Sequence, residues 1–271
     1  MHIKNSLNFK NILKIDLKKL KIKNISNLFV TSNLSKLKYP QLKKDLKLKL
    51  ILESIKETMG KNYTIFTPTS TLNLVNTNEI FDIKKTKSFK MGPLSEYIRN
   101  QNSVRSLHPY WSISAIGKNK NLLNNVSPHA YGHGSPWTIM LNEDSTQLNI
   151  GIHPSKAVTL IHHIETIAGV PYRFTREFKH KVKVKGIIKI KNFYMTVFYK
   201  SIPIKKKIKL NEHYFKELSK RKKINYTKNK FGLEMWSFKM KDFLELATEM
   251  FKKDIYCYLE KKPNLEKVHK N

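Results

Sequence analysis

The sequence predicts an α/β fold in which a mixed central β-sheet is flanked by helices on both faces (α/β/α). The chain has 271 residues and 40% hydrophobic content, enough to bury one substantial core. Short apolar runs typical of buried strands alternate with longer segments whose apolar residues recur every three or four positions, as in helices. The order strand, helix, strand near the start of the chain is typical of α/β proteins.

The first elements follow in order along the chain. Residues 9–24 mix Lys with Leu and Ile, which predicts a basic amphipathic helix that lies on a membrane or is simply solvated, and we favour the solvated helix. Residues 28–30 predict a short buried strand. Residues 42–58 predict a helix that Gly60 ends, and 63–66 predict a second strand.

The later segments continue this alternation. We expect strands at 138–142, 147–152 and 193–199, and helices at 154–168 and 239–252. Residues 181–191 and 203–209 alternate Lys with Val or Ile, which is the two-residue period of half-exposed strands. They therefore predict peripheral β-structure with a lysine-coated face.

The domain organisation is simple. We expect a basic N-terminal extension or helix (1–24), a single domain (25–258) and a basic C-terminal tail (259–271). No internal repeat and no Ser/Gly-rich linker is present. The lysine-rich segment 216–230 is interpreted as a loop that marks an insertion.

The charge of the chain is strongly positive. A formal net charge of +32 comes from 52 Lys and Arg against 20 Asp and Glu. The lysines are spread over the whole chain among abundant Asn and Ile, whose codons are rich in A and T, so base composition explains them as well as selection does. The positive potential would attract anionic ligands such as the phosphates of coenzyme A, without identifying them.

Cysteine use and hydropathy predict a cytoplasmic protein without a membrane span. Cys257 is the single cysteine, which excludes an intramolecular disulfide and a Cys-rich metal site. The first 24 residues carry a lysine every few positions and lack the apolar core of a signal peptide. No segment approaches the roughly 18 consecutive apolar residues that a spanning helix needs.

The chemistry-bearing residues gather where lysine becomes sparse, between positions 91 and 172. Four strings stand out there, namely MGPLSEYIRNQNSVRSLHPYWSISAIG (91–117), YGHGSPW (131–137), LNIGI (148–152) and VTLIHHIET (158–166). Read in this order, they resemble the aminoglycoside 3-N-acetyltransferase family. The resemblance extends more weakly over roughly residues 25–255.

The motifs match this family residue by residue. The most specific is a Gly-x-Leu followed by Arg-Ser-x-His-Pro-x-x-Ser-x-x-Ala-x-Gly, met by Gly92, Leu94, Arg105, Ser106, His108, Pro109, Ser112, Ala115 and Gly117. An aromatic-Gly-x-x-Ser-Pro loop follows at Tyr131, Gly132, Ser135 and Pro136. A Thr-x-x-His-x-x-Glu pattern then lies at Thr159, His162 and Glu165.

The resemblance implies an N-acyltransferase that uses acetyl-CoA, or another acyl-CoA, and no metal. The partners would be coenzyme A and a small, amine-bearing, sugar-like acceptor, with nucleic acid disfavoured and a homo-oligomer left open. The residues implied to contact the coenzyme are Ser32, Arg105, Ser106, His108, Ser112, Gly132 and Ser135. Those implied to contact the acceptor are Thr69, Tyr131 and Thr159.

His162 and Glu165 are the expected catalytic residues. Their spacing of three places both side chains on one face of the predicted helix. A protonated amine attacks a thioester only after losing a proton, and a positioned imidazole is a suitable base for it. Glu165 would orient the imidazole, stabilise imidazolium or bind the acceptor. His163 lies about 100° around the helix and is interpreted as structural.

The chain also departs from the family pattern. The first strand ends in Thr31, Ser32, Asn33 and Leu34 where the family usually has His-Ser-Ser-Leu. Residues 124–130 read NNVSPHA and lack the acidic residues that commonly precede the Gly-Ser-Pro loop in drug-modifying members. A polycationic antibiotic would need such carboxylates. We therefore expect an amino sugar or sugar nucleotide, for instance of a cell-surface polysaccharide, ahead of an aminoglycoside.

Two rival functions come from other classes. A metal-dependent hydrolase would gather His129, His133, His153, His162 and His163. A basic nucleic-acid-binding protein would use lysines to contact phosphates without reading sequence. Direct acyl transfer without a covalent enzyme intermediate remains the favoured interpretation, since Cys257 lies outside any Cys-His arrangement.

Overall fold

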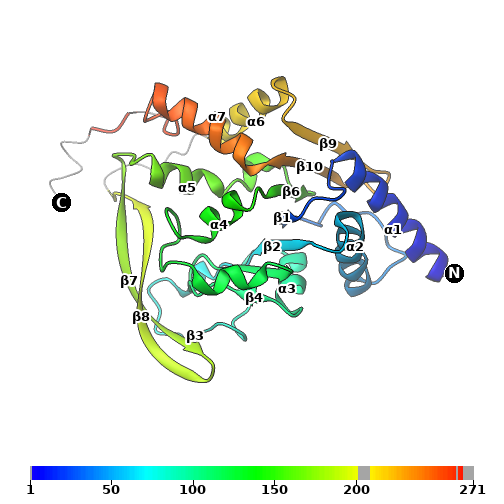
Figure 1. Cartoon of the computed structure of the whole chain (residues 1–271), viewed down its shortest axis with the longest axis horizontal. Helices are drawn as coiled ribbons and strands as arrows, with labels where there is room; N and C mark the ends of the chain where they lie inside the picture. Colours follow the sequence, from blue (N-terminus) through cyan, green and yellow to red (C-terminus); the bar gives the residue numbers. More distant parts are fainter. Residues whose placement is uncertain (1, 201–207, 261, 265–271) are drawn as a thin grey trace.

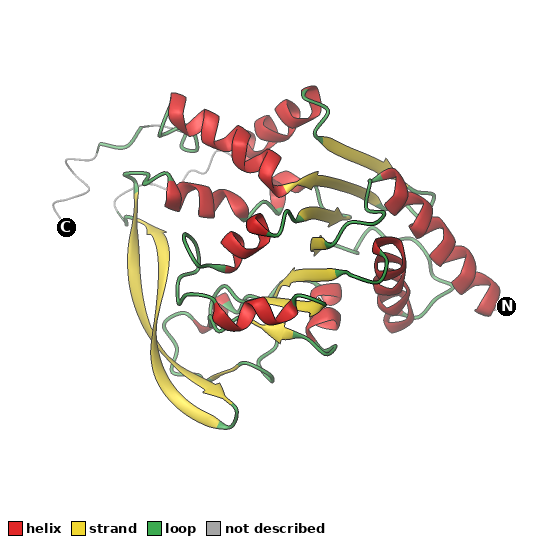
Figure 2. Ribbon diagram, viewed as in Figure 1, coloured by secondary structure: helices red, strands yellow, loops and turns green. Residues whose placement is uncertain are grey.

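A seven-stranded mixed sheet forms the centre of the molecule (Figures 1 and 2). The computed structural model describes residues 2–200, 208–260 and 262–264. The strand order is β4-β5-β2-β1-β6-β10-β9. The bounds are β1 (Asn27–Ser32), β2 (Thr64–Pro68), β4 (Val104–Arg105), β5 (Ile113–Gly117), β6 (Thr146–Ile150), β9 (Ile224–Lys228) and β10 (Glu234–Lys239). β1, β2 and β6 are parallel, and the other pairs are antiparallel.

Helices cover both faces of this sheet, which confirms the predicted α/β/α architecture. Successive strand residues point to opposite faces, so Leu28 and Val30 enter one apolar core and Phe29 enters the other. The first core is closed by α1 (His2–Lys19), α2 (Lys44–Met59) and α3 (Pro93–Arg99). The second is closed by α4 (Pro136–Asn142), α5 (Leu160–Ile167), α6 (Ile208–Lys220) and α7 (Met240–Lys253).

A second sheet projects from the body as a long arm (Figure 1). It is made of β3 (Phe81–Asp82), β7 (Arg173–Val184) and β8 (Ile187–Phe198). Lys185 and Gly186 turn the hairpin with φ angles of 49° and 83°, which suits the right-handed twist of the strands. The alternating segment 181–191 is therefore peripheral β-structure, as expected, and it consists of the ends of two strands and the turn between them.

The early elements agree with the sequence-based expectations, and three later ones do not. Segment 138–142 is helical in α4 because Ser135 and Pro136 occupy the N-cap and first helical positions, where proline favours a helix. Segment 154–168 divides into a 3-10 turn, Pro154–Lys156, and α5. Segment 216–230 contains the end of α6 and strand β9, so it is not an inserted loop.

Two expectations fall partly outside the described residues. The strand expected at 203–209 has residues 203–207 outside them, while 208 and 209 begin α6. Residues 261 and 265–271 of the expected basic tail also lie outside the described residues. Leu259, at the start of this tail, is buried in the core. Within the described part of the chain, no helix is long and apolar enough to cross a membrane.

The N-terminal helix is built into the domain. In α1, Phe9 is fully buried and its ring lies 5.1 Å from that of Tyr39 and 5.2 Å from that of Phe231. Lys14 Nζ reaches Glu57 Oε2 of α2 at 3.0 Å. The amphipathic pattern of residues 9–24 thus packs on the protein's own core, as a helix over His2–Lys19.

This packing makes a quantitative prediction. Phe9→Ala should lower the free energy of unfolding by about 3–5 kcal/mol because it empties a fully buried aromatic position. Urea denaturation followed by circular dichroism measures the change. Leu7→Ala, on the exposed side of the same helix at 59% exposure, is the matched control and should change it by less than about 0.5 kcal/mol. Equal, small effects of both variants would show that α1 is a dispensable extension.

Candidate functional site

The centre of the site is a histidine–glutamate pair on α5. His162 Nδ1 and Glu165 Oε2 are 2.8 Å apart. The side chain of His162 is 20% exposed, whereas that of Glu165 is fully buried. A spacing of three residues on a helix places both groups on one face, as the sequence analysis expects. The carboxylate therefore lies beneath the imidazole, and the imidazole lies between the carboxylate and the surface.

Two residues that follow α5 complete the environment of Glu165. Arg173 Nη2 lies 3.0 Å from Glu165 Oε2, and the Tyr172 hydroxyl donates a hydrogen bond to Oε1 at 3.0 Å. Burial opposes ionisation of Glu165, but the hydrogen bond from His162 and the charge of Arg173 outweigh it, so its pKa lies below the usual value. Burial and the neighbouring carboxylate raise the pKa of Tyr172. Glu165 is thus a carboxylate with three partners.

The contacts of His162 favour one tautomer. Arg173 Nη2 also approaches Nδ1 of His162, at 3.2 Å, but a guanidinium only donates hydrogen bonds. Nδ1 cannot accept from Arg173 while it donates to Glu165. The shorter, charge-assisted contact with Glu165 assigns the proton to Nδ1. Nε2, on the opposite edge of the ring, is then the nitrogen through which a base would act.

Aromatic side chains surround this pair. The rings of Tyr131 and Tyr258 meet His162 edge-on at 5.7 and 6.2 Å. Tyr131 belongs to the Gly-rich loop before α4, and Tyr258 follows α7. The guanidinium of Arg173 lies 3.7 Å from the ring centre of Phe198, which holds it in place. The site therefore combines three segments that are far apart in the sequence.

The Gly-rich loop is fastened to α5 by the second histidine. His163 Nδ1 accepts a hydrogen bond from the Gly132 N–H at 3.1 Å and lies 3.4 Å from Ser135 Oγ. Burial lowers the pKa of His163 to about 4, so it is a neutral acceptor. A Cβ at Gly132 would approach Thr166 within 3.2 Å at a φ of 84°. The loop thus needs glycine to lie against α5, whatever ligand it contacts.

The three residues predicted to contact the acceptor substrate do not all lie together. Tyr131 lies beside His162, and Thr159 occupies the N-cap position of α5, where its carbonyl accepts the His162 N–H at 3.0 Å. Thr69 instead is fully buried among hydroxyls, 3.1 Å from Ser114 Oγ. Its contact with an acceptor stays a prediction, and the geometry favours a structural role.

Four of the predicted coenzyme residues form an internal scaffold. Arg105 donates to Ser112 Oγ at 2.9 Å and to the carbonyls of Thr69 and Thr86. Ser106 Oγ accepts the N–H of Ile113, and His108 Nδ1 accepts that of Trp111 at 3.1 Å. Burial lowers the pKa of His108 to about 3. All four side chains are buried, so a direct coenzyme contact for them stays a prediction that their internal bonds disfavour.

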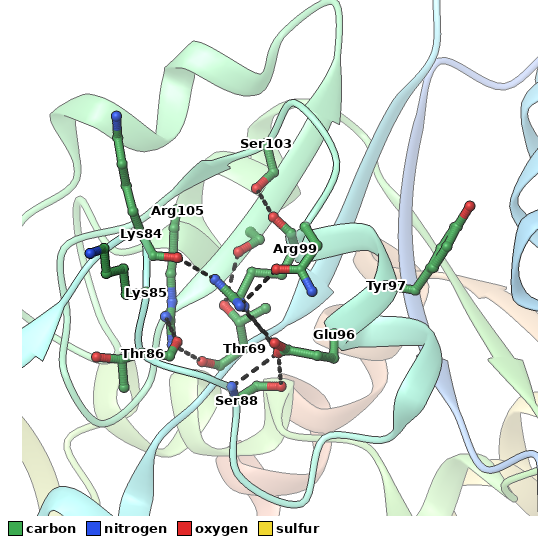
Figure 3. A network of polar contacts seen from close by, with 12 residues as sticks. Thr69, Lys84, Lys85, Thr86, Ser88, Glu96, Tyr97, Arg99, Ser103 and Arg105 are labelled. Carbon is green, nitrogen blue, oxygen red and sulfur yellow. Dashed lines mark hydrogen bonds and ion pairs between the residues drawn. The ribbon is translucent and has the colours of Figure 1, made fainter. Parts of the chain in front are cut away.

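A second network continues from this scaffold to the loop before α3 (Figure 3). Arg99 donates to both oxygens of Glu96, at 3.0 and 2.6 Å, and to the carbonyl of Lys84. The backbone N–H and the hydroxyl of Ser88 donate to the same carboxylate, at 3.1 and 2.8 Å. In Figure 3 these side chains converge between α3 and the preceding loop. The network fixes the segment that leads to Gly92.

That segment forms one wall of a cleft at the carboxyl ends of the parallel strands. The cleft has a volume of about 610 Å³ and is lined by Ser32, Lys44, Lys47, Lys90, Gly92 and neighbours. Ser32 Oγ is buried without a hydrogen-bond partner among the described residues. A Cβ at Gly92 would come within 3.0 Å of the Ser32 carbonyl. Thr31, in place of the family histidine, instead accepts a bond from Asn149 inside the sheet.

The histidines of the rival hydrolase do not gather. His162 and His163, both on α5, contact different partners, which are Glu165 and Gly132. The ring of His129 stacks on that of Tyr194, with ring centres 4.7 Å apart. His153 contacts Phe215 and Trp236. Across residues 2–200, 208–260 and 262–264, no group of three or more His, Cys, Asp or Glu side chains is placed to hold a metal ion.

Comparisons with known proteins agree with this architecture. The family model described as aminoglycoside 3-N-acetyltransferase matches residues 29–252. The chain belongs to this family and is accordingly an acyltransferase, in a family of acetyl-CoA-dependent enzymes. A search of curated proteins returned no match.

Solved structures share the fold at low sequence identity. AAC-IIIb in a binary complex with CoASH is 16% identical, with a TM-score of 0.77, and the match covers 94% of this chain and 98% of that one. AAC(3)-Xa is 16% identical, with a TM-score of 0.76 and coverage of 90% and 92%. A histidine-to-alanine variant of AAC(3)-IVa in complex with gentamicin is 18% identical, with a TM-score of 0.73 and coverage of 96% and 93%.

Sequence reasoning missed Arg173, Tyr172 and Tyr258. One signal could have found the first of them. Only five of the 52 basic residues are arginine, at positions 99, 105, 173, 176 and 221. In a chain that otherwise uses lysine, a retained arginine marks a position that needs a planar, multidentate cation. No comparable signal distinguishes Tyr172 and Tyr258 among 12 tyrosines.

The Glu96 network predicts a pH dependence of stability. Burial opposes its ionisation, but the bonds from Arg99 and Ser88 lower the pKa of Glu96 from 4.5 to about 2. A lowered folded-state pKa contributes stability that is present above pH 4.5 and lost as the pH falls toward 2. Glu96→Gln should therefore lower the urea midpoint at pH 7, and the difference from wild type should shrink across this window. Glu245→Gln, 66% exposed, is the control. A difference that persists unchanged to pH 2 would refute this assignment.

Proposed function

We propose that the protein transfers an acetyl group from acetyl-CoA to an amino group of an amino sugar, a sugar nucleotide or, less favourably, an aminoglycoside. His162 acts as the general base, and the amine attacks the thioester directly. The observation that carries this proposal is the contact of His162 Nδ1 with the buried, ionised Glu165, which orients the imidazole through Nδ1. The family assignment supports the reaction class.

The reaction balances with the residues present. As the amine nitrogen bonds to the thioester carbonyl carbon, its proton passes to His162 Nε2. Glu165 stabilises the imidazolium that results, because its carboxylate lies 2.8 Å from Nδ1. When the carbon–sulfur bond breaks, the imidazolium returns the proton to the departing thiolate. The acetamide and free coenzyme A are the products, and no covalent enzyme intermediate is needed.

The cleft at the carboxyl ends of β1 and β6 suits the coenzyme. Lys44, Lys47 and Lys90 line it and would neutralise phosphate groups. Ser32 supplies a buried hydroxyl with no partner among the described residues, which a ligand could satisfy. The relative crystallised with CoASH supports coenzyme binding to this fold. The use of coenzyme A and the single, buried Cys257 favour a cytoplasmic location.

Electrostatics favour an acceptor with few charges. The carboxylate nearest to the imidazole, Glu165, is already shared by His162, Arg173 and Tyr172. The loop 124–130 offers no acidic residue. A polycation would also approach a chain with a net charge of +32 against repulsion. The gentamicin complex belongs to a relative that is 18% identical, so it supports an amine acceptor without fixing its identity.

Removing the base tests the proposal. His162→Ala should reduce coenzyme A release from acetyl-CoA and an amino sugar by at least about 100-fold, the usual contribution of a positioned base. Acetyl-CoA binding, measured calorimetrically, should stay unchanged, and the thermal midpoint should fall because Glu165 loses one of its three partners. His213→Ala, an exposed histidine on α6, is the control. Turnover near the wild-type rate in a folded His162→Ala protein would rule out this base, and no turnover of any amino sugar by wild type would refute the acceptor class.

Arg173 is a positioning residue, and the pH dependence of kcat/KM distinguishes this role from a purely structural one. Its cation lies 3.2 Å from His162 Nδ1 and opposes protonation of the imidazole. In Arg173→Met the imidazolium becomes easier to form, so the rise of kcat/KM with pH should move upward by about 1 pH unit. Arg173→Lys retains the charge and should keep most of the wild-type profile. A lower kcat/KM with the same pH profile in both variants would mean that Arg173 only supports the fold.

A further inference from the structure

A second concavity lies between α6 and the β9–β10 edge of the sheet. It has a volume of about 700 Å³. Its walls are His153, Lys156, Glu212, Phe215, Lys216, Ser219, Ile224, Tyr226, Glu234 and Trp236, with Ser155 beside them. None of these residues belongs to the catalytic pair or to the cleft at Ser32. We call this concavity the α6 groove.

An aromatic platform forms one wall of the α6 groove. Tyr226 and Trp236 are directly paired across β9 and β10, with ring centres 5.3 Å apart. Tyr226 is 53% exposed, although aromatic side chains elsewhere mostly enter the two cores. His153 meets Trp236 edge-on at 5.2 Å, and Phe215 of α6 closes the back of the groove. The result is a partly exposed apolar surface of flat rings.

The polar rim of the groove is balanced in charge. Glu212 and Glu234 oppose Lys156 and Lys216, in a chain that otherwise has more than twice as many basic as acidic residues. The Tyr226 hydroxyl donates to Glu234 Oε1 at 3.1 Å, which fixes both groups at the rim. Two carboxylates disfavour a phosphate, and two lysines disfavour a polycation. A neutral ligand with an apolar face and several hydroxyls suits both the platform and the rim.

We propose that the α6 groove binds a sugar ring of a glycan that carries the acceptor amine. The axial C–H groups of a sugar form an apolar face that packs on Trp236 and Tyr226, whose ring faces are electron-rich. Its hydroxyls exchange hydrogen bonds with the charged rim. This inference rests on the proposed acyl transfer to amino sugars and extends it to longer acceptors.

Calorimetric titration without acetyl-CoA tests the groove alone. The probes are glucosamine and a β-1,4-linked trimer of one glucosamine and two N-acetylglucosamine units, which carries a single amine, on wild type, Tyr226→Ala and Trp236→Ala, with circular dichroism to verify folding. Wild type should bind the trimer at least about tenfold more tightly than the monomer, a gain of about 1.4 kcal/mol. Both variants should lose this gain. Phe89→Ala, which removes an aromatic ring of 39% exposure outside the groove, should keep it. Because Tyr226 lies on the exposed edge strand, its variant stays informative if Trp236→Ala fails to fold.

Three outcomes would overturn the inference. They are equal affinities for monomer and trimer, a gain that survives in Tyr226→Ala, or groove-dependent binding of adenosine monophosphate in place of sugars. Acetyl transfer to the monomer is measured separately. Turnover of glucosamine without a trimer preference refutes the groove and leaves the proposed function intact. A Trp236-dependent preference without turnover of either sugar refutes the proposed function and leaves the groove intact.

Discussion

The buried carboxylate of Glu165 is the interaction on which the geometry of the site depends. An isolated carboxylate with no exposed surface would be costly, so its position requires partners that satisfy both oxygens. His162 of α5, Tyr172 of the turn after it and Arg173 at the start of β7 provide them. Removing any one partner leaves a charge or a hydroxyl unmatched in the interior. The imidazole orientation is therefore a consequence of charge burial, and the proposed general base would use an arrangement that stability already demands.

The same solution appears a second time at Glu96, where Arg99 supplies two bonds to a carboxylate and a third to the Lys84 carbonyl. Arg105 similarly donates to one hydroxyl and two carbonyls. The side chains of Arg99, Arg105 and Arg173 are buried, in a chain whose lysines mostly lie at the surface. A lysine ammonium is a compact point charge and cannot span several fixed oxygens in a plane. The contrast explains why arginine persists at these positions in a lysine-rich chain.

The sequence identified features whose causes are local. The strands around 28–30 and 63–66 and the helix at 42–58 have strong apolar patterns, and the three-residue spacing places His162 and Glu165 together. The sequence pattern predicted a strand where α4 forms. Its residues have an apolar run typical of a strand, but Ser135 and Pro136 at the N-cap and first helical positions favour a helix. Strand β9, which lies in the lysine-rich segment 216–230, forms through pairing with β10, which no local pattern encodes. Tyr258 reaches His162 only because α7 folds back on α5.

Net charge has opposite consequences for the two substrates. In the proposed reaction, a positive field would draw a polyanionic coenzyme toward the lysine-lined cleft and repel a polycationic acceptor, and both effects weaken beyond about 10 Å at ordinary salt. An acceptor with a single amine must lose its proton, and with it its positive charge, before it attacks. A positive field disfavours the protonated amine and therefore favours the neutral, reactive form. An enzyme whose acceptor is weakly charged therefore does not need an acidic loop to bind that acceptor. For the proposed sugar acceptor, contacts with neutral hydroxyls and apolar sugar faces would then supply the affinity that carboxylates would give for a polycation.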